Sequence, residues 1–214
     1  MTAPTLPPEF VGAWYRVDIA LDGAEPSETQ TVWWLQAPSA FADLRVPLES
    51  GGEADSFAGH TTWTAPALTW DRHLDLHQHP VADVGTITWD GEDMLEDGTF
   101  GFAGGAPVAY RERWRRLGEP RGTGYVALRS ATARLVCVGN YGLTIVDDRE
   151  AGGSYRATAW HRPSVLWGEV MAWPPDHGDA PQPPDDIGGW QAGDTVRLDD
   201  GSEWTVDEIA EMAP

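Results

Sequence analysis

Lysine is missing from this chain of 214 residues, and cysteine occurs only once. All 14 basic residues are therefore arginines, which excludes Schiff-base catalysis and a lysine-linked pyridoxal phosphate. A single cysteine also excludes an intrachain disulfide, a CxxC redox pair and a thiolate zinc cluster. Because Cys137 lies in an apolar run, we expect it to be a buried structural thiol rather than a nucleophile.

The sequence also lacks long apolar runs and an excess of positive charge. No stretch of about 18 apolar residues occurs, and the opening MTAPTLPPEF has neither the basic nor the apolar part of a secretion signal, which predicts a cytoplasmic protein. The 34 acidic and 14 basic residues give a net charge of -20, which disfavours nucleic acid and membranes as partners. Because P-loop, GxGxxG, GxSxG and HExxH motifs are absent, we expect no cofactor, no nucleotide chemistry and no hydrolysis of these types.

Short alternating strands make up most of the chain. They are separated by turns rich in Gly, Asn and Asp, and there is hardly any helical periodicity. The pattern predicts an all-β protein with a single antiparallel lipocalin-like β-barrel of about 8-12 strands. We expect a disordered N-terminal arm at residues 1–9, the barrel at 10–173, a loop rich in Pro and Asp at 174–193, and a C-terminal hairpin with an acidic tail at 194–214.

Several blocks between residues 10 and 170 resemble a known family. Gly12, Trp14 and Tyr15 look like the GxWY opening of lipocalin-type (calycin) barrels, in which the tryptophan closes the barrel floor. The other blocks are VWWLQ at 32–36, DLR at 43–45, FAG at 57–59, WDR at 70–72, LD at 74–75, DVG at 83–85, EDG at 96–98, YRERW at 110–114 and VGNY at 138–141. Together they resemble the Hri family of fungal proteins and its bacterial relatives. The resemblance implies a β-barrel body and no established activity, and the His-rich segment at 72–80 departs from it.

Alternation along a strand predicts which side chains face the barrel interior. Tyr110, Glu112 and Trp114 share one face of their strand, and the opposite face carries a row of arginines that water solvates more easily. We therefore expect the Glu112 face to be inside. The same argument places these side chains inside: Trp14, Arg16, Asp18, Trp70, Arg72, Leu74 and Leu76.

The hairpin at residues 32–47 leaves its inner face open from pattern alone. In the second arm Phe41, Asp43 and Arg45 share one face, and Leu44 lies on the other. We expect the charged face to be inside because Phe41 accompanies it. An apolar interior formed by the Leu44 face is the alternative.

An interior with tryptophans and charges predicts a site for a small organic molecule that is anionic or carbonyl-bearing, because a guanidinium group binds such oxygens well. The candidate ligand-binding residues are Arg16, Arg45, Arg72, Trp14, Trp34, Trp70 and Trp114. A second hypothesis is a cofactor-independent lyase or isomerase, in which desolvation raises the pKa of a carboxyl group that acts as acid or base. Its candidate catalytic residues are Glu96, Tyr110 and Glu112. A third is a structural or partner-binding barrel whose Arg and Glu side chains pair with each other.

The segment RHLDLHQHP at 72–80 is the candidate metal site. His73, His77 and His79 fall on one side of an extended strand together with Asp75, and these ligand types suit a divalent ion. Residues two apart on a strand lie about 7 Å from each other, so they converge on one ion only if the chain bends. We favour a solvated polar face and keep metal binding as the alternative.

Overall fold

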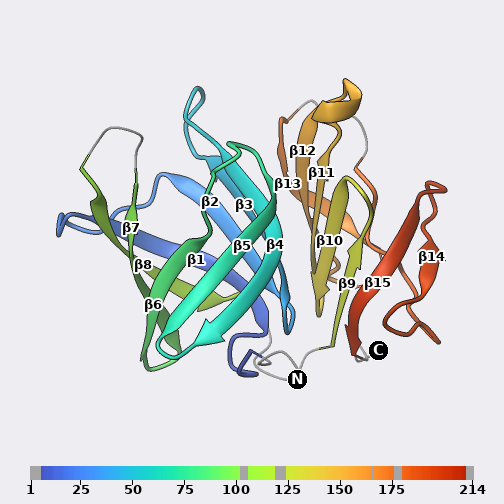
Figure 1. Cartoon of the computed structure of the whole chain (residues 1–214), viewed down its shortest axis with the longest axis horizontal. Coiled ribbons are helices and arrows are strands. Elements are labelled where there is room, and N and C mark those ends of the chain that lie inside the picture. The colour runs from blue at the N-terminus through green and yellow to red at the C-terminus, as the bar shows by residue number, and fades with distance from the viewer. Residues whose placement is uncertain (1–5, 102–105, 119–123, 165, 176–179, 211–214) are drawn as a thin grey trace.

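The N-terminal half of the protein forms a closed barrel of eight antiparallel strands (Figure 1). The computed structural model describes residues 6–101, 106–118, 124–164, 166–175 and 180–210. Each barrel strand pairs with the next along the chain, and the eighth closes the barrel against the first. The strands are β1 (Gly12–Leu21), β2 (Gln30–Gln36), β3 (Ala40–Pro47), β4 (Asp55–Thr64), β5 (Ala67–Asp75), β6 (Asp83–Asp90), β7 (Asp93–Phe100) and β8 (Val108–Arg116).

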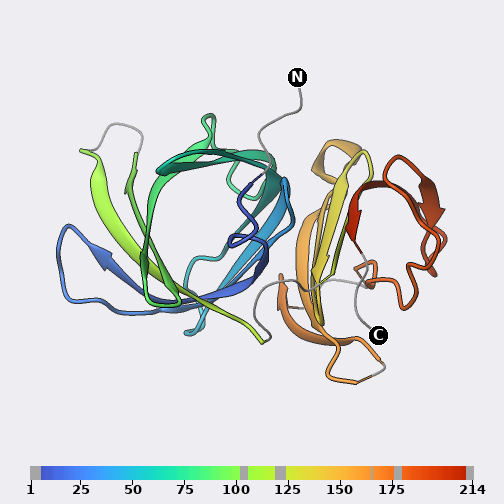
Figure 2. The same cartoon turned by 90° about the horizontal axis from the view of Figure 1, so that it is seen from below.

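Seven later strands form a separate antiparallel sheet in the order β13-β12-β11-β10-β9-β15-β14. Figure 2 shows this sheet beside the barrel, with β14 and β15 on the side away from it. The short 3-10 helix η1 (Arg149–Ala151) connects two of these strands, and no helix in the described ranges is long and apolar enough to span a membrane. The strands are β9 (Tyr125–Arg129), β10 (Ala133–Val138), β11 (Tyr141–Asp147), β12 (Tyr155–His161), β13 (Gly168–Trp173), β14 (Thr195–Arg197) and β15 (Glu203–Ala210).

The prediction of an all-β fold with an antiparallel barrel and little helix is confirmed. The barrel nevertheless ends earlier than the expected range 10–173. It closes at Arg116, and the next strand, which begins at Tyr125, belongs to the second sheet. Once β8 pairs with β1, the barrel has no free edge to which a later strand could add.

The barrel and the second sheet share an apolar interface. The outer face of the barrel contributes Trp33 and Leu44, and the sheet contributes Val136 and Ile145 to the same buried cluster. The ring of Trp33 meets that of Tyr141 edge-on, with 5.5 Å between the ring centroids. Strands β2 and β3 are therefore buried on both faces: one face points into the barrel and the other packs against the second sheet.

This interface decides the register question of the hairpin. Leu44 faces the second sheet, whereas Phe41 lies in the barrel interior with Trp34. Asp43 and Arg45 point to the same side as Phe41 and are largely buried. The expectation that the charged face lies inside is confirmed, because the opposite face has an apolar partner of its own.

One end of the barrel is closed by aromatic side chains around Trp14, which is fully buried. The Trp14 indole N–H donates to the carbonyl oxygen of Phe10 at 2.9 Å, and the Arg116 guanidinium lies 4.1 Å from the centroid of its ring. Leu6 joins the same core. The expected disordered arm at 1–9 therefore packs against the barrel from Leu6 onward, and residues 1–5 lie outside the described residues.

A β-bulge in β1 changes which side chains face inward. The pairing of β1 with β8 shifts between Arg16 and Asp18, so Ile19 comes opposite Glu112. Paired side chains point to the same side of a sheet, and Glu112 is inside. The expectation that Asp18 lies inside is thus wrong, and Ile19 takes that place because the bulge inserts one residue.

A second bulge in β5 has the same effect. Arg72 pairs with Gly59 but Leu74 pairs with Ala58, so His73 is the extra residue. Leu74 and Leu76 consequently pack against the outer cluster rather than in the barrel interior where we expected them.

Candidate functional site at the barrel mouth

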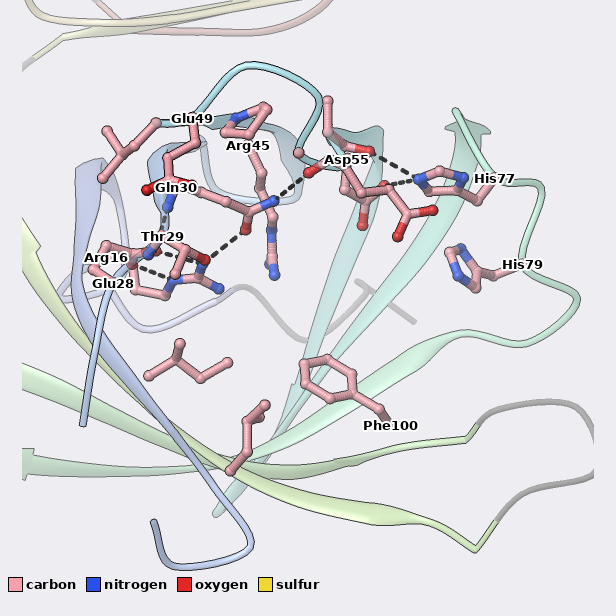
Figure 3. A pocket seen from close by; sticks show the side chains of 17 residues that line it. Arg16, Glu28, Thr29, Gln30, Arg45, Glu49, Asp55, His77, His79 and Phe100 are labelled. Carbon is pink, nitrogen blue, oxygen red and sulfur yellow. Dashed lines mark hydrogen bonds and ion pairs between the residues drawn. The ribbon is translucent and has the colours of Figure 1, made fainter. Parts of the chain in front are cut away.

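The end of the barrel opposite Trp14 contains a cavity of about 900 Å³, which we call the mouth cavity. Figure 3 shows its polar wall, where Arg16 and Arg45 hang from β1 and β3, facing Phe100 of β7. Ile19 and Leu21, turned inward by the first bulge, add apolar surface. The volume is in the range of known small-molecule sites.

Arg16 is held on its polar wall by every nitrogen of its guanidinium. Its Nε donates to Glu28 at 2.7 Å, and its Nη2 donates to Glu28 at 3.0 Å and to Gln30 at 2.9 Å. Its Nη1 donates to the buried carboxylate of Glu112. A bidentate clamp plus a buried ion pair fixes this side chain strongly.

Arg45 separates the mouth cavity from the barrel interior. Its Nε donates to Asp43 at 2.9 Å, and its Nη1 lies 3.4 Å from the same Glu112 oxygen that Arg16 contacts. Two arginines thus share the Glu112 carboxylate. Its side chain is 12% exposed, so part of it remains open to the cavity.

The carboxylates set the charge of this region. Burial raises the pKa of Asp43 to about 6, even though Arg45 lowers it. Burial alone would lower the pKa of Arg45, but Asp43 and Glu112 outweigh that effect and raise it well above its ordinary value. Both arginines are therefore charged, and they form ion pairs with three acidic side chains, Glu28, Asp43 and Glu112.

A second polar group lies deeper, around Glu96. The Tyr110 hydroxyl donates to one Glu96 oxygen at 2.7 Å, and the Trp114 indole N–H donates to the other at 3.1 Å. Burial, together with the negative charge of Glu112, raises the pKa of Glu96 well above its ordinary value. Burial also raises the pKa of Tyr110. The surroundings of Glu96 therefore favour its neutral, protonated form.

Two glycines make room for this deep group. A Cβ atom at Gly85 would lie 2.6 Å from Glu96 Cγ, and one at Gly98 would overlap the Tyr110 phenol ring. Gly85 of β6 pairs with Leu68 of the barrel interior, and Gly98 of β7 pairs with Tyr110, so both glycines are inner-face residues. The glycines of the DVG and EDG motifs therefore leave the space that the side chains of Glu96 and Tyr110 occupy.

Beneath Arg45 lies a small chamber of about 10 Å³, which we call the inner chamber. Its aromatic walls are Trp34, Trp70, Trp114 and Phe57. The rings pack closely, with centroids 5.7 Å apart for Trp34 and Trp70 and 5.5 Å apart for Trp34 and Trp114. Trp34, Trp70 and Trp114 were predicted to bind a ligand, but they border a space of about one water molecule and not the mouth cavity. The fourth predicted tryptophan, Trp14, lies at the closed end of the barrel.

Comparison with known proteins identifies the family. The HRI1 family model, described as Protein HRI1, matches residues 13–208. The chain belongs to the HRI1 family. No curated protein sequence matches it. A crystal structure titled as that of the uncharacterized protein YLR301w from Saccharomyces cerevisiae is similar, with a TM-score of 0.73 and 15% sequence identity over 93% of this chain and 98% of that one. At that identity the likeness shows a shared fold.

In this HRI1 family member, Arg72 lies apart from the mouth cavity. Its guanidinium stacks 3.7 Å from the centroid of the Phe57 ring, and its Nη2 donates to Asp83 at 2.7 Å. Its Nε is buried and has no hydrogen-bond partner in the described part of the chain. Arg72 is therefore brought near the inner chamber, whereas Arg16 and Arg45 line the mouth cavity.

Of the three candidate metal-binding histidines, only His77 and His79 are brought together, with 5.8 Å between their ring centroids. His73 lies beside Asp71 and the ring of His60. His77 contacts the carbonyl oxygen of Ala54 and His79 contacts Asp75, and both line the mouth cavity. Across the described ranges, no three His, Cys, Asp or Glu side chains are arranged to hold a metal ion. The bulge at His73 is the reason for its separation from the others.

Ile19, Leu21 and Glu28 are among the residues of the mouth cavity that the strand pattern does not predict. Alternation counted through the bulge places Ile19 and Leu21 on the outer face, whereas both line the cavity. Glu28 precedes β2 in a turn-rich connection, where alternation says nothing about direction. The signal that could have located it is Arg16, which needs a partner when buried.

Proposed function

We propose that the protein binds a small organic molecule in the mouth cavity of its barrel. The observation that carries this proposal is the cavity of about 900 Å³, whose polar wall contains Arg16 and Arg45, both held in place by the buried Glu112 carboxylate behind them. Preformed concave sites with apolar walls and a few oriented polar groups are typical of ligand binding. The packed core at the Trp14 end leaves the mouth as the place for a ligand.

The charge balance favours a carbonyl-bearing ligand over an anionic one. Arg16 and Arg45 are both neutralised by carboxylates, and Glu49, Glu53 and Asp55 add negative charge to the rim. An anion would meet repulsion there. Arg45 donates from Nε and Nη2 to Asp43 and from Nη1 to Glu112. Each terminal nitrogen carries a second N–H, which no contact with a described residue uses and which can donate to a neutral oxygen.

Binding is better supported than lyase or isomerase chemistry. Glu112 is held by two arginines, and Glu96 is held by Tyr110 and Trp114. Neither Glu96 nor Tyr110 lines the mouth cavity. Both oxygens of Glu96 are already occupied by Tyr110 and Trp114, so this arrangement suits a structural role for Glu96 and Tyr110.

Native mass spectrometry of freshly purified protein tests the proposal, because it detects a co-purified small molecule. The Ile19→Trp substitution fills the mouth cavity, and Ala20→Trp adds the same ring on the outer face, opposite Arg111. We expect a bound mass in the wild type and in Ala20→Trp and its loss in Ile19→Trp. A wild-type protein without bound mass, which no member of a fragment library protects against thermal unfolding, would overturn the proposal.

A further inference from the structure

The inner chamber and the mouth cavity are adjacent compartments divided by one side chain. Arg45 is the residue that borders both among the described residues. The chamber has room for about one water-sized atom. Arg45 thus places a space of about one oxygen atom next to the mouth cavity.

Trp34, one of the lining residues of this chamber, has an unsatisfied hydrogen-bond donor. Trp34 is 2% exposed, and its indole N–H is buried without any partner in the described residues. The neighbouring indoles differ, since Trp114 donates to Glu96 and Trp14 donates to Phe10. Buried donors are almost always paired in folded proteins, so we expect this N–H to donate to an acceptor that is not part of the described chain.

The walls of the chamber define the acceptor. Three acidic side chains, Asp43, Asp83 and Glu96, line it against the single guanidinium of Arg45, and this balance disfavours an anion. An ammonium group offers no lone pair to an indole N–H. A neutral hydroxyl or carbonyl oxygen meets both conditions, and its size matches the chamber.

We propose that the inner chamber is an oxygen subsite, in which a ligand held in the mouth cavity places a neutral hydroxyl or carbonyl oxygen beside Arg45 to accept from the Trp34 indole N–H. This inference rests on the proposed function of the mouth cavity. In this proposal Trp34 recognises one oxygen atom of the ligand, and Arg45 lies between the mouth cavity and the inner chamber. A water molecule offers the same chemistry, and the test distinguishes it from a ligand.

The probes are benzylacetone, the alcohol formed by its reduction, and butylbenzene, which has the same carbon skeleton without oxygen. Their binding is followed by NMR through the indole N–H signals and the signals of Ile19 and Phe100 in the mouth cavity. The variant is Trp34→Phe. Trp70→Phe is its matched control, because it removes an indole from the same chamber and leaves the Trp34 donor in place.

We expect the ketone and the alcohol to bind about tenfold more tightly than butylbenzene, the effect of one added hydrogen bond. They should shift the Trp34 indole signal. The preference should survive in Trp70→Phe and vanish in Trp34→Phe. If Trp34→Phe does not fold, the wild-type Trp34 signal gives the answer alone.

Two results would overturn the inference. If the probes move the signals of the mouth cavity and leave the Trp34 indole signal unchanged, the chamber holds water only and the proposed function stands. If no signal moves with any probe, the oxygen subsite is wrong and the result also counts against a mouth-cavity ligand of this class.

Discussion

Glu96 and Glu112 are direct cross-strand partners on β7 and β8, and both carboxyl groups lie inside the barrel. Two buried carboxylates side by side repel each other, so only one of them is stable in its ionised form. Glu112 is paired with two arginines, whereas Glu96 is bonded by a hydroxyl and an indole. The two neighbouring acids therefore lie in different surroundings, and those of Glu96 raise its pKa well above the ordinary value.

This difference predicts a flatter pH profile for Glu96→Gln. Because burial raises the pKa of folded Glu96, the free energy of unfolding falls as pH rises from the ordinary carboxyl pKa through the folded one. A glutamine amide is neutral at every pH, and its oxygen can accept from Trp114 while its NH2 faces the Tyr110 oxygen. We expect near wild-type stability at about pH 5 and a relative gain at about pH 8, measured by urea unfolding.

The control for this measurement is Glu92→Gln, on the exposed turn between β6 and β7. It removes the same charge from the protein without touching the interior. Equal pH profiles for the two variants would show that the Glu96 carboxyl is ionised after all.

Asp43 predicts a second pH effect in a lower window. Its folded pKa of about 6 exceeds the ordinary value because of burial, so the folded state holds a proton that the unfolded chain releases. Its contribution to stability is complete below about pH 4 and is lost as pH rises to about 6, by roughly 2–3 kcal/mol. Asp43→Asn should remove this slope. Unfolding curves across the window test it, and an Asp43→Asn protein that keeps the wild-type slope would contradict it.

The inner face of most barrel strands was predictable because charge made one face hard to bury. The arginine row beside Glu112 could only face water, and it does so, with Arg111 paired to Asp97 on the surface. The all-β class followed from strand length and turns alone. These are local properties of the sequence, and local properties decide which face of a strand is buried.

The parts of the site that could not be predicted depend on insertions and on distant chain segments. A bulge adds one residue without a sequence signature, and each bulge reversed the predicted side of the residues after it, such as Asp18 in β1 and Leu74 in β5. The end of the barrel at Arg116 depends on β8 meeting β1, about a hundred residues away in sequence. Alternation also does not show how tightly facing tryptophans pack. The sequence therefore predicts an open interior around Trp34, Trp70 and Trp114, where the structure shows closely packed rings.

The shared carboxylate of Glu112 predicts a large cost for removing Arg16. In Arg16→Met, Glu112 keeps only the longer contact to Arg45, and Glu28 loses its cation. Breaking a buried ion pair from one side costs about 3–5 kcal/mol. Arg111→Met removes an exposed arginine with a comparable bidentate partner and should change stability little. Chemical unfolding of both variants checks this, and equal losses would mean that the buried network contributes no more than a surface pair.

Gly98 predicts a steric effect on the deep polar group. A methyl group in Gly98→Ala would overlap the Tyr110 ring and push its hydroxyl away from Glu96. Overpacking of this kind costs about 1–3 kcal/mol. Gly101→Ala is the matched control, because a Cβ atom there meets no described residue within 4 Å. We expect thermal unfolding to show a clear loss for Gly98→Ala and almost none for Gly101→Ala. Tyr110→Phe added to Gly98→Ala should recover little, since the clash involves the ring as well as the hydroxyl, and full recovery would place the conflict at the hydroxyl alone.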